Sequence, residues 1–233
     1  MKTIGLLGGM SWESTVPYYR IINRRVAQRL GGLHSAKIVL YSVDFHEIEL
    51  FQSSDRWVEA GSSLADAAKS VARAGADFLM LCTNTMHRVA PEIEARIRIP
   101  LLHIVDPTAR ALQMAECQTV GLLGTRFTME MDFYRGRLES EFDLAVHVPR
   151  AASRELVHEV IYSELCRGVV SESSREKFRQ VVSELESVGA EAIILGCTEI
   201  GLLLRTEDAS IPLFDTTRLH AEAAASFALD AQE

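Results

Sequence analysis

Two short segments of the chain carry side chains suited to proton transfer at carbon. One reads Cys82-Thr83-Asn84-Thr85-Met86-His87 and the other Gly196-Cys197-Thr198-Glu199. A thiol can do such work because its reference pKa of about 8.5 leaves a usable thiolate fraction near neutral pH, more so at a helix amino end. We expect a helix to begin after Cys197, with Glu199 in its first turn. The alternative for Cys197 is that it packs as a small buried hydrophobic residue.

The other cysteines are Cys82, Cys117 and Cys166. The four thiols form no CxxC pair and have no histidine at zinc-finger spacing, which argues against a redox motif and against a structural zinc site. Cys82 directly precedes Thr83, so in an extended chain its side chain points to the opposite side. Cys166 closes a predicted helix. We expect these three cysteines to be packing residues. The presence of four unpaired thiols favours a reducing, cytoplasmic compartment.

Short apolar runs that alternate with longer amphipathic stretches must position these segments. The runs predict strands at residues 3–7, 37–43, 77–81, 101–105, 119–123, 144–148 and 191–195, and helices fill the intervals, for example at 57–73 and 175–188. Gly75 and Gly189 stand where helix C-caps belong. The alternation predicts an α/β fold with mainly parallel sheets flanked by helices.

An internal repeat divides the chain into halves. Residues 3–8 match residues 119–124 at five of six positions, and residues 75–83 resemble residues 189–197 at nearly the same offset. Ile99-Pro100-Leu101 returns as Ile211-Pro212-Leu213. Three matches in the same order imply two similar α/β domains, which we place at residues 1–104 plus 215–233 and at residues 105–214.

The repeat makes Thr83 and Cys197 equivalent positions, each just beyond the end of a strand. In open α/β sheets, ligands bind beyond the carboxyl ends of the strands. If the halves face each other across a cleft, these two side chains stand on opposite sides of one ligand. That arrangement suits a reaction at a stereocentre.

Composition narrows the function further. The chain has 233 residues, 48% of them hydrophobic and 24% charged, which is typical of a soluble globular protein. A formal charge of -8 argues against a nucleic-acid partner but leaves an anionic small molecule open. No run approaches the roughly 18 apolar residues of a membrane span, and we interpret residues 1–10 as a first strand and turn, not a signal peptide.

Several polar residues allow two interpretations. Residues 5–10 resemble a phosphate-binding turn only loosely, because they fit neither GxGxxG nor GK[ST], so tight turns against a ligand or a neighbouring helix are favoured. Thr125 and Thr128 could cap a helix, bind a ligand carboxylate, or do both. His87 could be a structural histidine or a proton carrier.

The segments 8–15, 82–87 and 195–199 together resemble the cofactor-independent aspartate/glutamate racemase family, and the resemblance runs over essentially the whole chain. The resemblance implies two pseudo-symmetric α/β domains with the active site in the interdomain cleft. It also implies a two-base mechanism that needs no metal, pyridoxal phosphate or other cofactor, and a homodimer.

One departure from the family pattern matters for mechanism. The family's first motif begins Cys-Asn-Thr, whereas this chain has Thr83-Asn84-Thr85. Cys197 aligns with the second family cysteine, which faces the α-hydrogen of the L-isomer. The resemblance therefore implies that Cys197 deprotonates L-aspartate or L-glutamate, that Thr83 stands on the opposite face, and that D-isomers turn over poorly. Related sequences often carry a lysine near Cys166, and Arg167 could replace it as a carboxylate partner.

By the same resemblance, a set of polar residues is expected to contact the substrate: Met10, Gln52, Asn84, Thr85, Thr125, Thr128, Thr198 and Glu199. Two other functions remain open. One is a related enzyme such as an arylmalonate-type decarboxylase or isomerase, although the polar lining argues against an aryl pocket. The other is a non-catalytic protein that binds an acidic amino acid.

Overall fold

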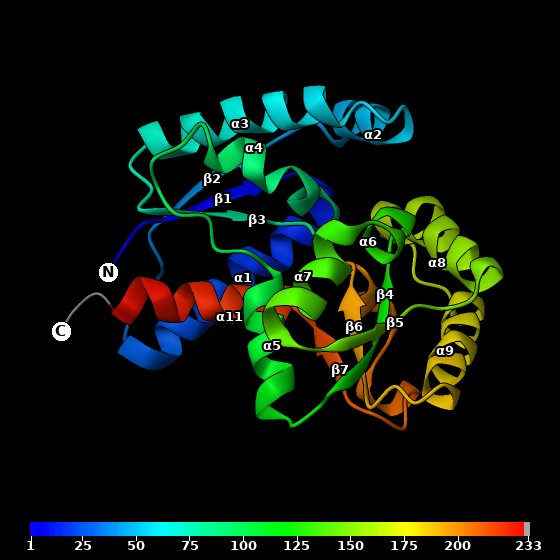
Figure 1. Ribbon diagram of the computed structural model, residues 1–233. Coiled ribbons are helices and arrows are strands. Elements are labelled where there is room, and N and C mark those ends of the chain that lie inside the picture. Colours follow the sequence, from blue (N-terminus) through cyan, green and yellow to red (C-terminus); the bar gives the residue numbers. More distant parts are fainter. Residues whose placement is uncertain (231–233) are drawn as a thin grey trace. The chain divides into compact units, whose positions relative to one another are not determined.

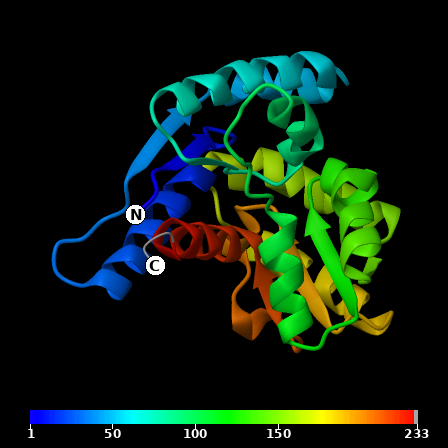
Figure 2. The ribbon, with the colours of Figure 1, turned by 60° about the vertical axis from the view of Figure 1, so that its left-hand side comes forward.

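The computed structural model describes residues 1–230, whose contacts divide the chain into two compact units. The first unit comprises Met1–Ile104 together with the segment from His220 onward, and the second comprises Val105–Leu219. Each unit is built on a parallel sheet flanked by helices (Figures 1 and 2), so the predicted α/β fold with two similar halves is confirmed.

The first unit has the strand order β2-β1-β3. Its elements are β1 (Ile4–Gly8), α1 (Trp12–Leu30), β2 (Ile38–Ser42), α2 (Phe45–Ser53), α3 (Trp57–Arg73), β3 (Phe78–Leu81), the 3-10 helix η1 (Thr85–Val89) and α4 (Ala90–Glu94). Helix α11 (Thr216–Leu229) returns to this unit at the end of the chain. In Figure 1, α3 and α4 lie on one side of the sheet, and α1 and α11 lie on the other.

The second unit has the strand order β5-β4-β6-β7. Its elements are α5 (Val105–Met114), β4 (Thr119–Gly124), α6 (Arg126–Glu130), α7 (Asp132–Phe142), β5 (Ala145–His147), α8 (Ala151–Ser163), η2 (Leu165–Arg167), α9 (Glu172–Ser187), β6 (Ala192–Gly196), α10 (Ile200–Leu203), η3 (Thr206–Asp208) and β7 (Leu213–Asp215). Helices α5 and α7 pack on one side of this sheet, and α8 and α9 pack on the other (Figures 1 and 2).

Apolar packing between β1, β3, α1 and α11 forms a core of the first unit. Strand residues such as Ile4 and Met80 meet Tyr18 and Ile22 of α1, and α11 adds a face of alanines at positions 221, 224, 225 and 228. Full burial of each large side chain contributes about 1.5–3 kcal/mol. The alanines let α11 approach closely, because they carry nothing beyond Cβ.

A glycine in the first strand of each unit explains part of the repeat. A Cβ added at Gly5 would lie 2.6 Å from Val71 Cγ1 on α3 and 2.8 Å from the carbonyl oxygen of Phe78. A Cβ added at Gly121 would lie 2.9 Å from Leu185 Cδ1 on α9. Both glycines therefore let a helix pack closely on the strand. For Gly5 this agrees with the expected approach to a neighbouring helix, although Gly5 lies within β1 and not in a turn.

The helix ends that the sequence predicted are present, but one strand is not. Gly75 and Gly189 have φ of 93° and 97°, the left-handed region that favours glycine at a C-cap. The predicted strand 101–105 is wrong, because only Leu101 bridges to Leu79 and α5 already begins at Val105. Strand β7 was not predicted, although its first residue, Leu213, belongs to the repeated Ile-Pro-Leu segment.

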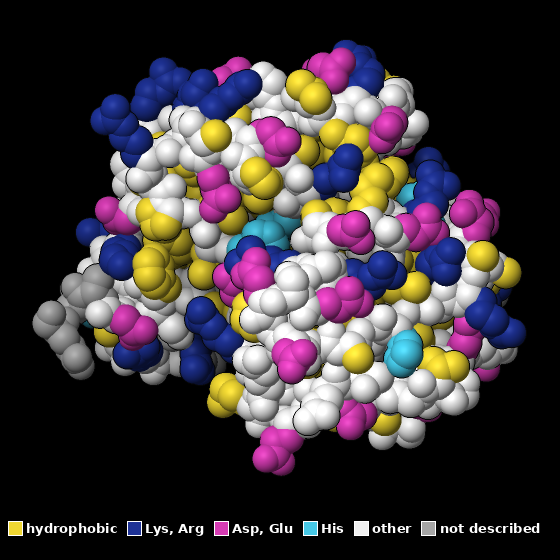
Figure 3. All heavy atoms as spheres, viewed as in Figure 1, with side chains coloured by type: hydrophobic (Ala, Val, Ile, Leu, Met, Phe, Trp, Pro, Cys, Tyr) yellow, Lys and Arg dark blue, Asp and Glu magenta, His cyan; other side chains and the backbone are white. Residues whose placement is uncertain are grey.

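The surface carries charges of both signs. Figure 3 shows Lys and Arg side chains interspersed with Asp and Glu over the face in view. Within residues 1–230, no helix combines the length and apolar character that a membrane span requires.

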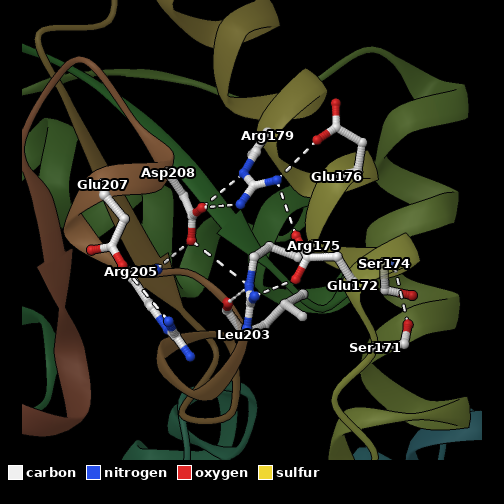
Figure 4. A network of polar contacts seen from close by, with 10 residues as sticks. All are labelled: Ser171, Glu172, Ser174, Arg175, Glu176, Arg179, Leu203, Arg205, Glu207 and Asp208. Atoms are coloured by element: carbon white, nitrogen blue, oxygen red, sulfur yellow. Dashed lines mark hydrogen bonds and ion pairs between the residues drawn. The ribbon is translucent and has the colours of Figure 1, made fainter.

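A buried aspartate ties α9 to the segment that follows α10 (Figure 4). The Asp208 side chain is 1% exposed, and its carboxylate accepts hydrogen bonds from the Arg205 N–H at 2.8 Å and from Arg179 Nε at 2.7 Å. Arg175 donates from Nε to the carbonyl oxygen of Leu203, the last residue of α10, at 2.8 Å. The network therefore anchors α10, which directly follows the Cys197 segment.

We predict that Asp208→Asn lowers the free energy of unfolding by about 1–3 kcal/mol at pH 7, because charged hydrogen bonds are lost. Burial alone would raise the pKa of Asp208, but the hydrogen bonds from Arg205 and Arg179 outweigh it and lower that pKa. A lowered pKa in the folded state stabilises the protein above the unfolded value of about 3.9, and this contribution is lost as the pH falls through the folded value.

Urea unfolding between pH 2.5 and pH 7 measures this effect. The difference between wild type and variant should be largest above about pH 5 and disappear in strong acid. Glu207→Gln is the control, because Glu207 is 69% exposed and pairs with Arg205 only at 3.7 Å. Its effect should stay below about 0.5 kcal/mol. A difference for Asp208→Asn that does not change with pH would contradict the network's electrostatic role.

Candidate active site

The candidate residues gather where the strand order of each sheet reverses direction. Strand β1 lies between β2 and β3, and β4 lies between β5 and β6. In such sheets, loops that leave the central strand and its neighbour on opposite faces open a crevice at their carboxyl ends. Parallel pairing of Leu7 with Leu81, and of Leu123 with Leu195, brings the following loops together within each unit.

In the first unit, hydroxyl groups join the loop after β1 to the loop after β3. Ser14 Oγ donates to the carbonyl oxygens of Ser11 at 2.7 Å and Cys82 at 3.1 Å. Thr15 Oγ1 accepts the Gly9 N–H at 2.9 Å. These hydroxyls hold the backbone of the two loops in place.

The first unit also buries most of the residues expected to contact substrate. The exposed fractions are 3% for Met10, 3% for Gln52, 6% for Thr83, 3% for Asn84 and 4% for Thr85. Gln52 comes from α2 and donates from Nε2 to Met86 Sδ at 2.8 Å, which brings it to the segment that contains Thr83. Buried polar side chains at a loop are unusual unless hydrogen bonds or a ligand satisfy them.

His87 holds the Thr83 loop as a neutral imidazole. Its Nε2 accepts the Ile104 N–H at 3.2 Å, so the proton sits on Nδ1, which donates to the carbonyl oxygen of Thr83 at 2.8 Å. Burial lowers the pKa of His87 well below its usual value, and the neighbouring His103 and His220 lower it further. Both ring nitrogens thus form hydrogen bonds with the backbone, which favours a structural role for this histidine over a role as proton carrier.

In the second unit, the loop after β4 presents a pair of buried threonines. Thr125 caps α6 by accepting the Thr128 N–H at Oγ1 over 3.3 Å, and the two hydroxyl oxygens lie 3.2 Å apart. Thr125 is 5% exposed and Thr128 is fully buried. The capping role is therefore present, and a ligand role for the pair stays a prediction.

Cys197 lies directly after β6, and its thiol faces a carboxylate. Its Sγ donates to Glu199 Oε2 at 3.0 Å, and Thr198 Oγ1 donates to the same oxygen at 2.5 Å. Burial raises the pKa of the Cys197 thiol well above its usual value, and the charge of Glu199 raises it further. The backbone N–H of Glu199, just before α10, lowers this pKa, but burial and the Glu199 carboxylate outweigh it, so the net lowering expected at a helix amino end is not found.

The other thiols differ from Cys197 in their surroundings. Cys82 is fully buried in the core of the first unit, as the alternation of side chains predicted, and burial raises its pKa. Cys117 lies before β4, and burial raises the pKa of its thiol as well. Cys166 lies in η2, and its Sγ is 3.6 Å from Glu199 Oε1.

The amino-acid sequence of the chain matches a known family. Residues 7–224 match the family described as Asp/Glu/Hydantoin racemase. The chain belongs to this family.

Similar proteins agree with the family assignment. The broad specificity amino-acid racemase RacX of Bacillus subtilis is 25% identical over 232 residues, which cover 96% of both chains. A crystal structure from Yersinia pestis, of a protein proposed to be an Asp/Glu racemase, is 55% identical with a TM-score of 0.91 and covers 98% of this chain and 100% of its own. An aspartate racemase homologue from Pyrococcus horikoshii is 33% identical with a TM-score of 0.84, over 98% and 100% of the two chains.

Sequence reasoning about this racemase-family chain missed the proximity of Cys166 to Glu199. This contact joins positions 33 residues apart in the chain. No spacing rule connects a 3-10 turn to a strand end at that distance, and the one available signal was the lysine that related sequences carry nearby. Arg167, the other residue considered there, is exposed at the end of η2.

We predict that His87→Phe destabilises the protein by about 1–3 kcal/mol, because the Thr83 carbonyl and the Ile104 N–H lose their partner in a buried place. Denaturant unfolding at pH 7 measures the change. His34→Phe is the control at an exposed histidine and should stay within about 0.5 kcal/mol. Equal effects of the two substitutions would rule out a special role for His87.

Proposed function

We propose that this protein is an amino-acid racemase that inverts the α-carbon of L-aspartate, L-glutamate or both without a cofactor. Cys197 removes the α-proton, and Thr83 stands on the opposite face of the substrate. The observation that carries the proposal is the equivalent placement of Thr83 and Cys197, each two residues beyond the paired leucines Leu81 and Leu195 at the reversal point of its sheet.

The chemistry that these side chains can perform follows from their donors and acceptors. The Cys197 thiolate takes the α-proton, so a C–H bond breaks, an S–H bond forms, and negative charge spreads from the α-carbon into the substrate carboxylate. The buried hydroxyl and amide groups of Asn84, Thr85, Thr125 and Thr128 are suited to hold the substrate and that charge. A proton then returns to the other face from Thr83 or from a water that Thr83 holds.

The threonine makes the reaction one-sided. An alkyl hydroxyl is a far weaker acid than a thiol, so Thr83 does not supply a base for removing the α-proton of a D-isomer. Each tenfold loss in rate corresponds to about 1.4 kcal/mol in the barrier. A few kcal/mol on one face are therefore enough to make L-isomers the effective substrates.

We predict that the wild-type protein, incubated with L-glutamate or L-aspartate in heavy water, exchanges the α-hydrogen for deuterium, and that Cys197→Ser reduces this exchange by at least roughly 100-fold. Proton NMR of the substrate measures the α-hydrogen signal, and Cys117→Ser is the matched control at a distant thiol. Binding of the amino acid without exchange would instead favour a non-catalytic binding protein. Release of carbon dioxide from arylmalonate would favour a decarboxylase.

A second prediction concerns the opposite face. Thr83→Cys should raise the exchange rate of D-glutamate or D-aspartate relative to the L-isomer by roughly tenfold or more, because a thiol replaces a hydroxyl. Thr83→Ser is the control that keeps the hydroxyl and should leave the D/L ratio near that of the wild type. An unchanged ratio in Thr83→Cys would mean that residue 83 does not face the α-carbon.

A further inference from the structure

Glu199 lies at the centre of a buried cluster in the second unit. It is 2% exposed and sits directly before α10. Its Oε2 accepts from Cys197 and Thr198, and its Oε1 lies 3.6 Å from Cys166 Sγ. The Cys197 thiol is the donor of its pair with Glu199, so its proton points at Oε2.

This geometry makes direct loss of the Cys197 proton to solvent costly. A thiolate formed that way would place a second negative charge beside the carboxylate in a buried site, and burial and Glu199 both raise the pKa of the thiol. Transfer of the proton from sulfur to Oε2 instead keeps the net charge of the pair constant. Over 3.0 Å, this transfer needs no movement of either heavy atom.

We propose that Glu199 is the base that accepts the Cys197 proton, and that Cys166 is a positioning residue that holds the Glu199 carboxylate for this transfer. The inference rests on the proposed function and deepens it. In the first step the S–H bond of Cys197 breaks and an O–H bond forms on Glu199. In the second step the thiolate takes the α-proton of the substrate, which leaves the carbanion and restores the thiol. Glu199 then releases its proton to solvent, which balances the proton that the other face of the substrate receives.

The turn that carries Cys166 is itself fixed. Gly168 ends it in the left-handed region with φ of 73°. The Glu164 carboxylate, just before the turn, accepts hydrogen bonds from the hydroxyls of Ser171 and Ser174 at the start of α9. The thiol of Cys166 is thereby held beside Oε1, so that Oε2 remains directed at Cys197. The ionisable side chains that act on Cys197 include Glu199 and Cys166, and both belong to this cluster.

Glu199→Gln tests the proton acceptor, because glutamine keeps the size of the side chain and removes the basic oxygen. The wild type should exchange the α-hydrogen of L-glutamate or L-aspartate at a rate nearly constant between pH 7 and pH 9. The variant should lose roughly 100-fold or more at pH 7 and regain about tenfold per pH unit, because its thiol must now lose its proton to solvent. A flat profile near the wild-type rate, or a change in KM alone, would overturn the proposal.

Cys166 is tested by removal and rescue. Cys166→Ala should lower kcat by roughly tenfold with little change in KM, and Cys166→Ser, which keeps a donor, should restore most of it. Cys117→Ser is the matched control and should leave both constants unchanged. Equal loss in the alanine and serine variants would overturn the positioning role.

A measurement without substrate separates this inference from the proposed function. The rate of Cys197 alkylation by iodoacetamide, followed by peptide mass spectrometry from pH 6 to pH 11, reports the titration of the thiol. Removal of the carboxylate charge in Glu199→Gln should move the midpoint down by about one pH unit or more. If the wild type exchanges no α-hydrogen, the proposed function fails, but a shifted alkylation midpoint would still support the coupling between Cys197 and Glu199. An unchanged midpoint would overturn that coupling. Should Glu199→Gln not fold, Glu199→Asp, which withdraws the carboxylate from Sγ, provides the same comparison.

Discussion

Parallel pairing between each central strand and its neighbour is the constraint on which the rest of this structure depends. The pairs Leu7–Leu81 and Leu123–Leu195 bring two loops to one place in each unit. Gly5 and Gly121 in the central strands leave room for α3 and α9 to pack on these sheets. A side chain at either position would push a helix away from the sheet that supports the loops.

Placing polar loops at buried strand ends makes hydrogen bonding obligatory. The side chains of Ser14, Thr15 and His87 form hydrogen bonds with backbone groups, and Thr125 caps α6. An unmade hydrogen bond in such a place costs about 1–3 kcal/mol. These hydrogen bonds therefore fix the backbone of the loops that carry the candidate residues.

The two units have similar backbones at the candidate positions but carry different side chains there. The residue before each candidate position points away from the strand end, so Cys82 lies in the core and glycine stands at position 196, where a Cβ would lie 2.8 Å from Leu122 Cδ1. Thr83 and Cys197 follow them. In the second unit, the Glu199 carboxylate accepts a hydrogen bond from the Cys197 thiol. The asymmetry of the proposed reaction thus arises from side chains on matching backbones.

The amino-acid sequence by itself determined the α/β class, the two similar halves and the family, because periodicity, repeats and motifs are local patterns along the chain. The same motifs led to the proposal of Thr83 and Cys197. Sequence reasoning missed β7, and it placed a strand at 101–105 where the chain forms only a single bridge at Leu101 before α5. Only the tertiary structure decided the state of the groups at the site: the neutral tautomer of His87, the raised pKa of Cys197 and the approach of Cys166 to Glu199. Burial and contacts between distant residues set these properties, and neither can be counted along a sequence.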